Sequence, residues 1–176
     1  MQTLITYASQ YGSTRKYAER FAELTGYPIL PYGEVRSLAG YDRVIHFGAL
    51  YAGGVMGLRR IASLLPAQTQ LVVVTVGLAD VQDAENTQHI LKDIRSRLPE
   101  SVMSRTRVFH LRGAIDYGKL GFKHRTMMSM LYAKAKGIPE EKRTADTKSL
   151  IETYGQQVSF FSETALRSLA DVLLQQ

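Results

Sequence analysis

A cluster of hydroxyl-bearing residues lies near the start of the chain, between an apolar run and an amphipathic segment. Ser9, Ser13 and Thr14 carry hydroxyl groups that can donate hydrogen bonds. Gly12 lets the backbone approach a ligand without an obstructing Cβ atom. A helix that begins near Ser13 directs its free N–H groups and its positive dipole end at the same point. These features are typical of a phosphate-binding loop, and the alternative is an ordinary helix N-cap. The candidate loop comprises Ser9, Gln10, Tyr11, Gly12, Ser13 and Thr14.

Two later segments have a composition suited to holding a flat ring. Residues 48–54 are dense in glycine and contain one aromatic residue, Tyr51, whose ring could stack on a ligand or cover neighbouring backbone at the rim. Residues 75–80 follow an apolar run and could offer backbone N–H groups to ring carbonyl oxygens. Together with the first loop, they predict a site for a heteroaromatic ligand with a phosphate tail. The further candidate residues are Ala49, Leu50, Tyr51, Ala52, Gly53, Thr75, Val76, Gly77, Leu78 and Asp80.

The elements that must position these segments alternate between strands and helices. Apolar runs predict strands at residues 2–7, 27–30, 42–47, 70–76 and 106–111. Helical spacing predicts helices at residues 13–24, ended by Gly26, and at 58–65, 83–98 and 120–136, with a terminal helix or helix pair over 148–174. The uninterrupted run at residues 71–74 is typical of a central parallel strand covered on both faces. This α/β pattern predicts a five-stranded parallel sheet whose carboxyl edge gathers the candidate loops.

Composition limits the chemistry that the chain can perform alone. With 176 residues, 45% of them hydrophobic, we expect a single domain over residues 1–176 with an ordinary core. The absence of cysteine excludes disulfides, zinc–thiolate sites and thiol nucleophiles, so redox chemistry would need a bound cofactor. Because no signal peptide or run of about 18 apolar residues is visible, we expect a cytoplasmic protein.

Positive charge is concentrated in one part of the chain. Residues 105–148 contain 11 of the 22 lysines and arginines but only 4 of the 16 acidic residues, within a net charge of +6. Such a segment indicates anionic partners, although a solvated face is the commoner outcome. Within it, the methionine-rich stretch 120–136 has two interpretations. It is a crossover helix with methionines facing the sheet, or it forms with residues 112–118 a lip over the site that attracts an acidic substrate or an anionic membrane.

The first loop carries a resemblance to a known family. The run Ser9-Gln10-Tyr11-Gly12-Ser13-Thr14 resembles the flavodoxin phosphate loop, Thr/Ser-x-Thr-Gly-x-Thr, with Tyr11 in place of the middle threonine. The whole chain is similar to the flavodoxin-domain branch that includes menaquinone-dependent protoporphyrinogen oxidases. The resemblance implies a flavodoxin-like doubly wound sheet of order 2-1-3-4-5 with helices on both faces. It also implies non-covalently bound FMN.

Several functions stay open at this point. The resemblance favours an FMN-dependent oxidoreductase of haem biosynthesis with a small-molecule or quinone redox partner, and the alternatives are an electron carrier without a substrate and an FMN-binding regulatory domain. We expect no nucleic-acid partner, and peripheral membrane contact and a homodimer remain open. The chain lacks a Walker loop, a Gly-x-Gly-x-x-Gly fingerprint after the first strand and a Gly-x-Ser-x-Gly elbow. The four histidines lack metal-ligand spacing, and His46 and His110 are interpreted as structural; the others are His89 and His124. No catalytic acid or base is identified, and no metal is expected.

Overall fold

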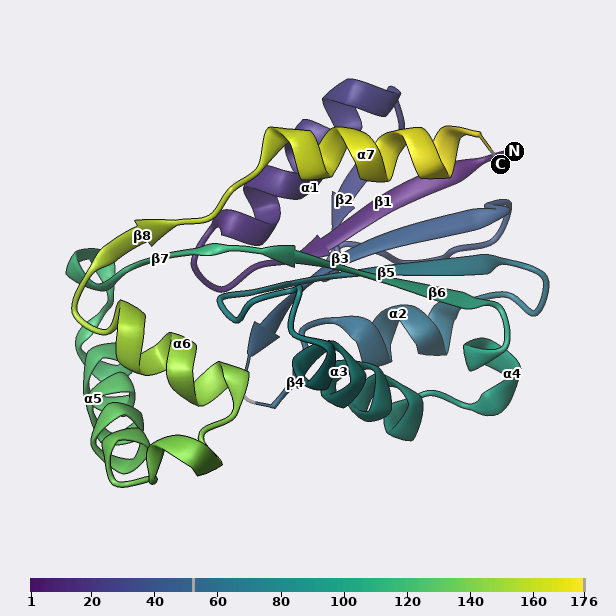
Figure 1. The fold of residues 1–176 in the computed structure, drawn as a ribbon. Helices are drawn as coiled ribbons and strands as arrows, with labels where there is room; N and C mark the ends of the chain where they lie inside the picture. Colours follow the sequence, from purple (N-terminus) through teal and green to yellow (C-terminus); the bar gives the residue numbers. More distant parts are fainter. Residues whose placement is uncertain (52, 176) are drawn as a thin grey trace.

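A parallel five-stranded sheet forms the centre of the computed structural model, which describes residues 1–51 and 53–175 (Figure 1). Its strand order, β2-β1-β3-β5-β6, confirms the predicted order 2-1-3-4-5. A short strand, β4, adds to it by pairing antiparallel with β3. The strands are β1 (Thr3–Ala8), β2 (Ile29–Pro31), β3 (Arg43–Tyr51), β4 (Gly54–Val55), β5 (Gln70–Gly77) and β6 (Thr106–Arg112).

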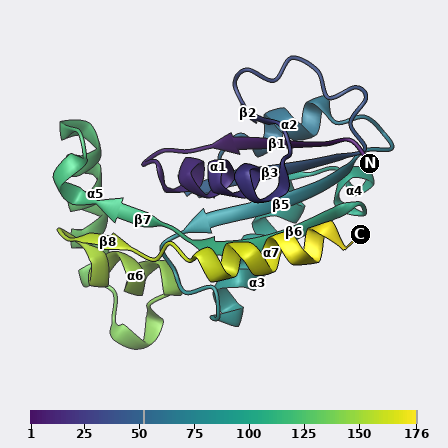
Figure 2. The same cartoon turned by 90° about the horizontal axis from the view of Figure 1, so that it is seen from above.

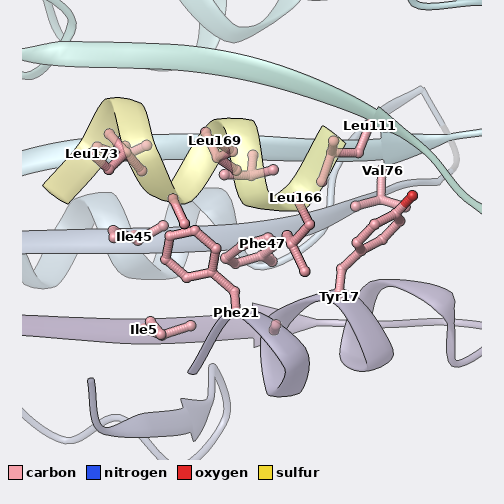
Figure 3. Packing of buried hydrophobic residues seen from close by; sticks show 14 residues of the cluster. Ile5, Tyr17, Phe21, Ile45, Phe47, Val76, Leu111, Leu166, Leu169 and Leu173 are labelled. Atoms are coloured by element: carbon pink, nitrogen blue, oxygen red, sulfur yellow. The ribbon is translucent and has the colours of Figure 1, made fainter. Parts of the chain in front are cut away.

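Helices cover both faces of this sheet, as expected for a doubly wound fold (Figures 1 and 2). One face carries α1 (Ser13–Thr25) and α7 (Glu163–Leu174), and the other carries α2 (Leu58–Leu64), α3 (Ala84–Arg97) and the short α4 (Glu100–Met103). Strand β5 serves both cores, because Val72 and Val74 face one while Leu71 and Val73 face the other. Figure 3 shows the first core, where Phe21 and Phe47 meet the leucines of α7.

Local sequence sets the ends of the helices. Gly26 adopts the left-handed conformation and donates its N–H to the Ala22 carbonyl, which ends α1 as predicted. Asp83 caps α3 by accepting hydrogen bonds from the N–H groups of Glu85 and Asn86. These caps fix where each helix begins and ends relative to the carboxyl edge of the sheet.

The segment predicted as a glycine-rich loop after the third strand is different in the structure. Strand β3 continues through Tyr51 and turns into a hairpin with β4, so Ala49, Leu50 and Tyr51 are strand residues. Gly48 permits this hairpin, since a Cβ atom at that position would lie 2.2 Å from Val55 Cγ1. The glycine therefore serves close packing rather than loop flexibility. Ala52 lies outside the described residues.

The basic helix also differs from the crossover interpretation. Helix α5 (Phe122–Lys136) packs on α6 (Ala145–Thr153) beyond the carboxyl edge, and its methionines do not face the sheet. A two-stranded antiparallel ribbon of β7 (Ala114–Asp116) and β8 (Gln157–Ser159) connects this helix pair to the core. The predicted terminal helix pair is thus α6 and α7 with β8 between them. Two short 3₁₀ turns, η1 (Tyr117–Lys119) and η2 (Glu140–Lys142), flank α5.

Candidate functional site

The loop between β1 and α1 presents the unsatisfied N–H groups of a helix terminus. Gly12, at the N-cap, is left-handed with φ 92°, and no side chain caps the helix. The first hydrogen bond of α1 runs from the Lys16 N–H to the Gly12 carbonyl, which leaves the preceding N–H groups of the first turn without helical partners. The Ser9 hydroxyl stabilises the turn by accepting from the Gly12 N–H at 3.1 Å. This geometry suits an anionic group at the helix terminus.

The Ser13 hydroxyl of this loop lies beside Gly113, next to the ends of β5 and β6. A Cβ atom at Gly113 would be 2.9 Å from Ser13 Oγ, so a glycine there gives the Ser13 side chain its room. Gly113 in turn donates its N–H to the Gly77 carbonyl at 2.6 Å. Thr14 is only 1% exposed and belongs to the first turn of α1. The donors present therefore fit a phosphate-bearing cofactor held between the loop and the β5 end.

An aromatic cluster brings together three segments that are far apart in the sequence. Tyr11 and Tyr51 meet edge to face with ring centroids 6.3 Å apart. His124 of α5 lies 5.8 Å from the Tyr11 ring and 6.2 Å from the Tyr51 ring. The Nε2 atom of His124 is 3.2 Å from the side-chain amide nitrogen of Gln10. Helix α5 therefore contacts two of the predicted ligand segments.

Sequence reasoning did not assign His124 to the site. The residue is separated from Gln10 by 114 positions, and its neighbours carry no recognisable pattern. Only the path of the chain beyond β6 brings it to the loop. Helix α5 therefore lies against two candidate ligand segments, and the prediction that it attracts an acidic substrate or an anionic membrane stays a prediction.

Residues 75–80, expected as an exit loop, begin inside β5, which extends to Gly77, so that only Leu78, Ala79 and Asp80 follow the strand. The Thr75 hydroxyl is buried and lies 2.7 Å from His110 Nδ1, and burial lowers the pKa of that histidine. Val76 packs into the core. The Leu78 carbonyl accepts two hydrogen bonds from the Arg112 guanidinium, at 3.0 and 2.8 Å. Asp80 accepts from the Gln82 N–H and stabilises the loop itself.

A cavity of about 590 Å³ extends from this edge toward α3 and α6. Its size is typical of small-molecule and cofactor sites. Of the predicted residues it is lined by Tyr11, Leu50, Tyr51, Gly53, Gly77 and Leu78, whereas Ser9, Gln10, Gly12, Ser13, Thr14, Ala49, Thr75, Val76 and Asp80 lie outside the lining. The remaining walls come from α3, α5, α6 and nearby backbone, through Gly54, Ala79, His89, Ile90, Asp93, Ile115, Met127, Met128, Leu131, Asp146, Ser149 and Leu150.

The charges around the cavity differ from those that the lip interpretation expects, namely basic residues that attract an acidic substrate to the site. None of the described lining residues is a lysine or an arginine. Asp93 forms an ion pair with Arg97 at 2.7 Å, and Asp146 is exposed at the cavity wall. The basic residues of α5 are instead exposed to solvent. The excess positive charge therefore lies on the outer surface and not inside the cavity.

The two strand histidines are structural, as expected. His46 is fully buried, with Nδ1 2.9 Å from the Thr6 hydroxyl and Nε2 2.7 Å from the Met56 carbonyl. Because a carbonyl can only accept, Nε2 carries the proton and Nδ1 accepts from Thr6. Among the described residues, no group of three or more histidine, cysteine, aspartate or glutamate side chains could hold a metal ion.

The wound sheet with an uncapped helix terminus at its carboxyl edge has the arrangement found in α/β proteins that bind phosphate-bearing ligands. A family model described as a flavodoxin domain matches residues 4–142. The chain therefore belongs to the flavodoxin-domain family. The search of curated proteins gave no match. In the described part of the chain, no helix is both long and apolar enough to cross a bilayer.

Proposed function

We propose that this protein is an FMN-dependent oxidoreductase with an activity similar to that of protoporphyrinogen oxidase and a quinone as electron acceptor. Flavodoxin-like domains typically bind FMN, and the free N–H groups before Lys16 are suited to its phosphate. Bound FMN would supply reversible one- and two-electron transfer. The chain's own residues would bind the phosphate at the first loop and orient the ring between Tyr51 and the segment at Gly77 and Leu78.

The observation that carries this proposal is the cavity. An electron carrier needs only an exposed cofactor edge that a protein partner can approach. Here α5 and α6 add walls beyond the sheet, and Met127, Met128 and Leu131 give the cavity an adaptable apolar side. These walls would bury more of a bound small molecule than an exposed cofactor edge does, which favours an enzyme over a carrier.

Turnover separates these two functions. We expect the FMN-loaded protein to oxidise protoporphyrinogen IX steadily when menadione is present as the acceptor, at many cycles per flavin. The same preparation without added FMN, after its cofactor has been removed, is the control for spontaneous oxidation. Fast exchange with one-electron carriers together with a failure on every two-electron donor would instead identify an electron carrier.

The outer face of α5 supports a second part of the proposal, peripheral contact with an anionic membrane. Phe122 is 86% exposed and Met130 is 64% exposed on this helix. Four exposed basic residues of the same helix surround them: Lys123, Arg125, Lys134 and Lys136. Basic residues at a protein surface are attracted to an anionic bilayer, and the exposed apolar side chains beside them can contact it. This orientation would leave the cavity side of α5 facing the protein.

Vesicle binding tests this contact. Each basic residue near an acidic bilayer contributes about 1 kcal/mol before salt screening, so replacing Lys123, Lys134 and Lys136 by glutamine should lower co-sedimentation with anionic vesicles by about tenfold or more. A matched variant with Arg36, Arg59 and Arg95 changed to glutamine loses the same charge from other exposed positions. Equal losses of co-sedimentation in both variants would show that binding depends on net charge and not on the basic residues of α5. Negligible vesicle binding by the wild-type protein would contradict the proposed membrane contact.

A further inference from the structure

The guanidinium of Arg112 is bound to a single backbone carbonyl at the exit of β5. Its Nε and Nη2 atoms donate hydrogen bonds to the Leu78 carbonyl at 3.0 and 2.8 Å. None of the ion pairs among the described residues includes Arg112, so its charge acts on this carbonyl without a competing carboxylate from that part of the chain. Arginine presents its donors as a rigid planar fork, which holds an acceptor in a defined direction. The Leu78 carbonyl is therefore oriented by a cation.

Neighbouring elements hold Arg112 in this position. Its guanidinium lies over the ring of Phe160, 3.6 Å from the ring centroid. The Arg112 carbonyl accepts a hydrogen bond from the Tyr17 hydroxyl at 2.9 Å, so α1 fixes the backbone of the arginine. The Gly113 carbonyl accepts from the Phe160 N–H at 3.0 Å, which joins the stacked ring to the same turn. Helix α1 and the segment before α7 thus place the guanidinium on the Leu78 carbonyl.

The peptide group that Arg112 binds carries an unpaired donor. Leu78 and Ala79 are joined by a trans peptide, which directs the Leu78 carbonyl and the Ala79 N–H to opposite sides. Ala79 is 4% exposed and lines the cavity, whereas Arg112 is not a lining residue. The Ala79 N–H makes no hydrogen bond to any residue that the structure describes. Because buried backbone N–H groups are nearly always paired, this donor indicates that a bound molecule supplies the acceptor.

We propose that Arg112 is a positioning residue for the cofactor ring: by holding the Leu78 carbonyl, it directs the Ala79 N–H at an acceptor atom of the ring. The two charged donors also polarise the peptide group, which makes its N–H a stronger donor. That the ring is the flavin of FMN rests on the proposed function, but the orientation of the peptide is a property of the chain alone. Because reduction increases the electron density on the flavin ring, this donor stabilises the reduced ring more than the oxidised one.

Replacement of Arg112 by methionine tests this role. Methionine keeps an unbranched side chain that can contact the Phe160 ring, but it has neither the charge nor the N–H donors. Arg112→Met should weaken the binding of oxidised FMN by about two- to tenfold, the value of one hydrogen bond. Riboflavin, which has the same ring and no phosphate, should lose the same factor. Reduced FMN should lose more affinity than oxidised FMN, so the flavin midpoint potential should fall.

Two matched variants separate positioning from folding. Arg112→Lys keeps the charge but not the planar fork, and should recover part of the affinity and part of the potential. Arg105 lies at the opposite end of β6 (Figure 1) and likewise donates to backbone carbonyls, those of Pro66, Thr69 and Ser101. Arg105→Met should therefore lower the melting temperature and leave flavin affinity and potential unchanged.

Amide hydrogen exchange in the flavin-free protein tests the orientation of the peptide without a cofactor. The N–H groups of Gln82 and Asp83 are both hydrogen-bonded to Asp80, so their exchange reports opening of the loop after β5. Loss of the charged hydrogen bonds in Arg112→Met should make both amides exchange about tenfold faster or more. In Arg105→Met they should exchange at the wild-type rate.

Turnover separates this inference from the proposed function. Flavin affinity that depends on Arg112, in a protein that does not oxidise protoporphyrinogen IX, would support the inference and contradict the proposed function. Steady turnover in Arg112→Met with wild-type flavin affinity and potential would overturn the inference alone. A loss of affinity for FMN but not for riboflavin would also overturn it, because the guanidinium would then act on the phosphate. Unchanged exchange in Arg112→Met would do the same, since the loop would keep its conformation without the guanidinium.

Discussion

FMN affinity is expected to fall by about 10- to 150-fold when Thr14 is replaced by valine. The change removes one charge-assisted hydrogen bond to the phosphate, which is worth about 1.5–3 kcal/mol. Valine keeps the shape of the side chain, which matters because Thr14 is almost fully buried in the first turn of α1. Titration of the flavin-free protein with FMN, followed by quenching of flavin fluorescence, measures the effect.

Two matched variants separate phosphate binding from folding. Thr14→Ser keeps the hydroxyl and should retain most of the affinity. Thr25→Ala removes a threonine hydroxyl from the opposite end of α1, where it donates to the Phe21 carbonyl, and should leave FMN affinity unchanged. If Thr14→Val binds FMN as tightly as the wild-type protein, then the hydroxyl does not contact the phosphate and the backbone N–H groups account for the site.

The free energy of unfolding is expected to fall by about 2 kcal/mol between pH 7 and pH 5 because of His46 alone. Burial lowers the pKa of His46 to about 4, whereas in the unfolded chain it has the ordinary value of about 6.5. Below pH 6.5 the unfolded state therefore binds a proton that the native state does not. The neutral His46 side chain gives its full stabilisation above pH 6.5, and by pH 4 the free energy of unfolding has fallen by about 3 kcal/mol.

Denaturant unfolding at several pH values isolates this contribution. In His46→Gln the amide can still donate to the Met56 carbonyl but does not titrate, so the variant should lose less stability on acidification. His89→Gln, at an exposed position on α3, should follow the wild-type protein. Parallel pH curves for His46→Gln and the wild-type protein would assign the acid sensitivity to other groups.

The central sheet could be predicted because its signals are local. A valine-rich run such as residues 71–74 indicates a strand covered on both faces, and Gly26 marks the end of α1 through its own backbone conformation. The loop before Ser13 was recognisable for the same reason, since hydroxyls, glycine and helix start are adjacent in the sequence.

The cavity walls could not be predicted because they depend on contacts between distant segments. Gly48 was interpreted as a loop residue, yet it is a strand residue whose missing Cβ makes room for Val55 of the returning hairpin. The amphipathic pattern of α5 indicated a buried face but not which surface would cover it. Only the path of the chain in the structure therefore shows that His124 contacts Tyr11 and that Ser149 lines the cavity.

Residues 117–156 form an insert whose two ends meet at the β7–β8 ribbon. Asp116 pairs directly with Gln157, so the chain leaves the core and returns to it at neighbouring positions. Loop-closure entropy grows only slowly with the length of an excursion, so the core bears little extra cost for an excursion of this size. A short hairpin turn in its place would preserve the route from β6 to α7. Sequence changes within residues 117–156 can therefore alter the α5 and α6 walls of the cavity while the central sheet and the first loop keep their structure.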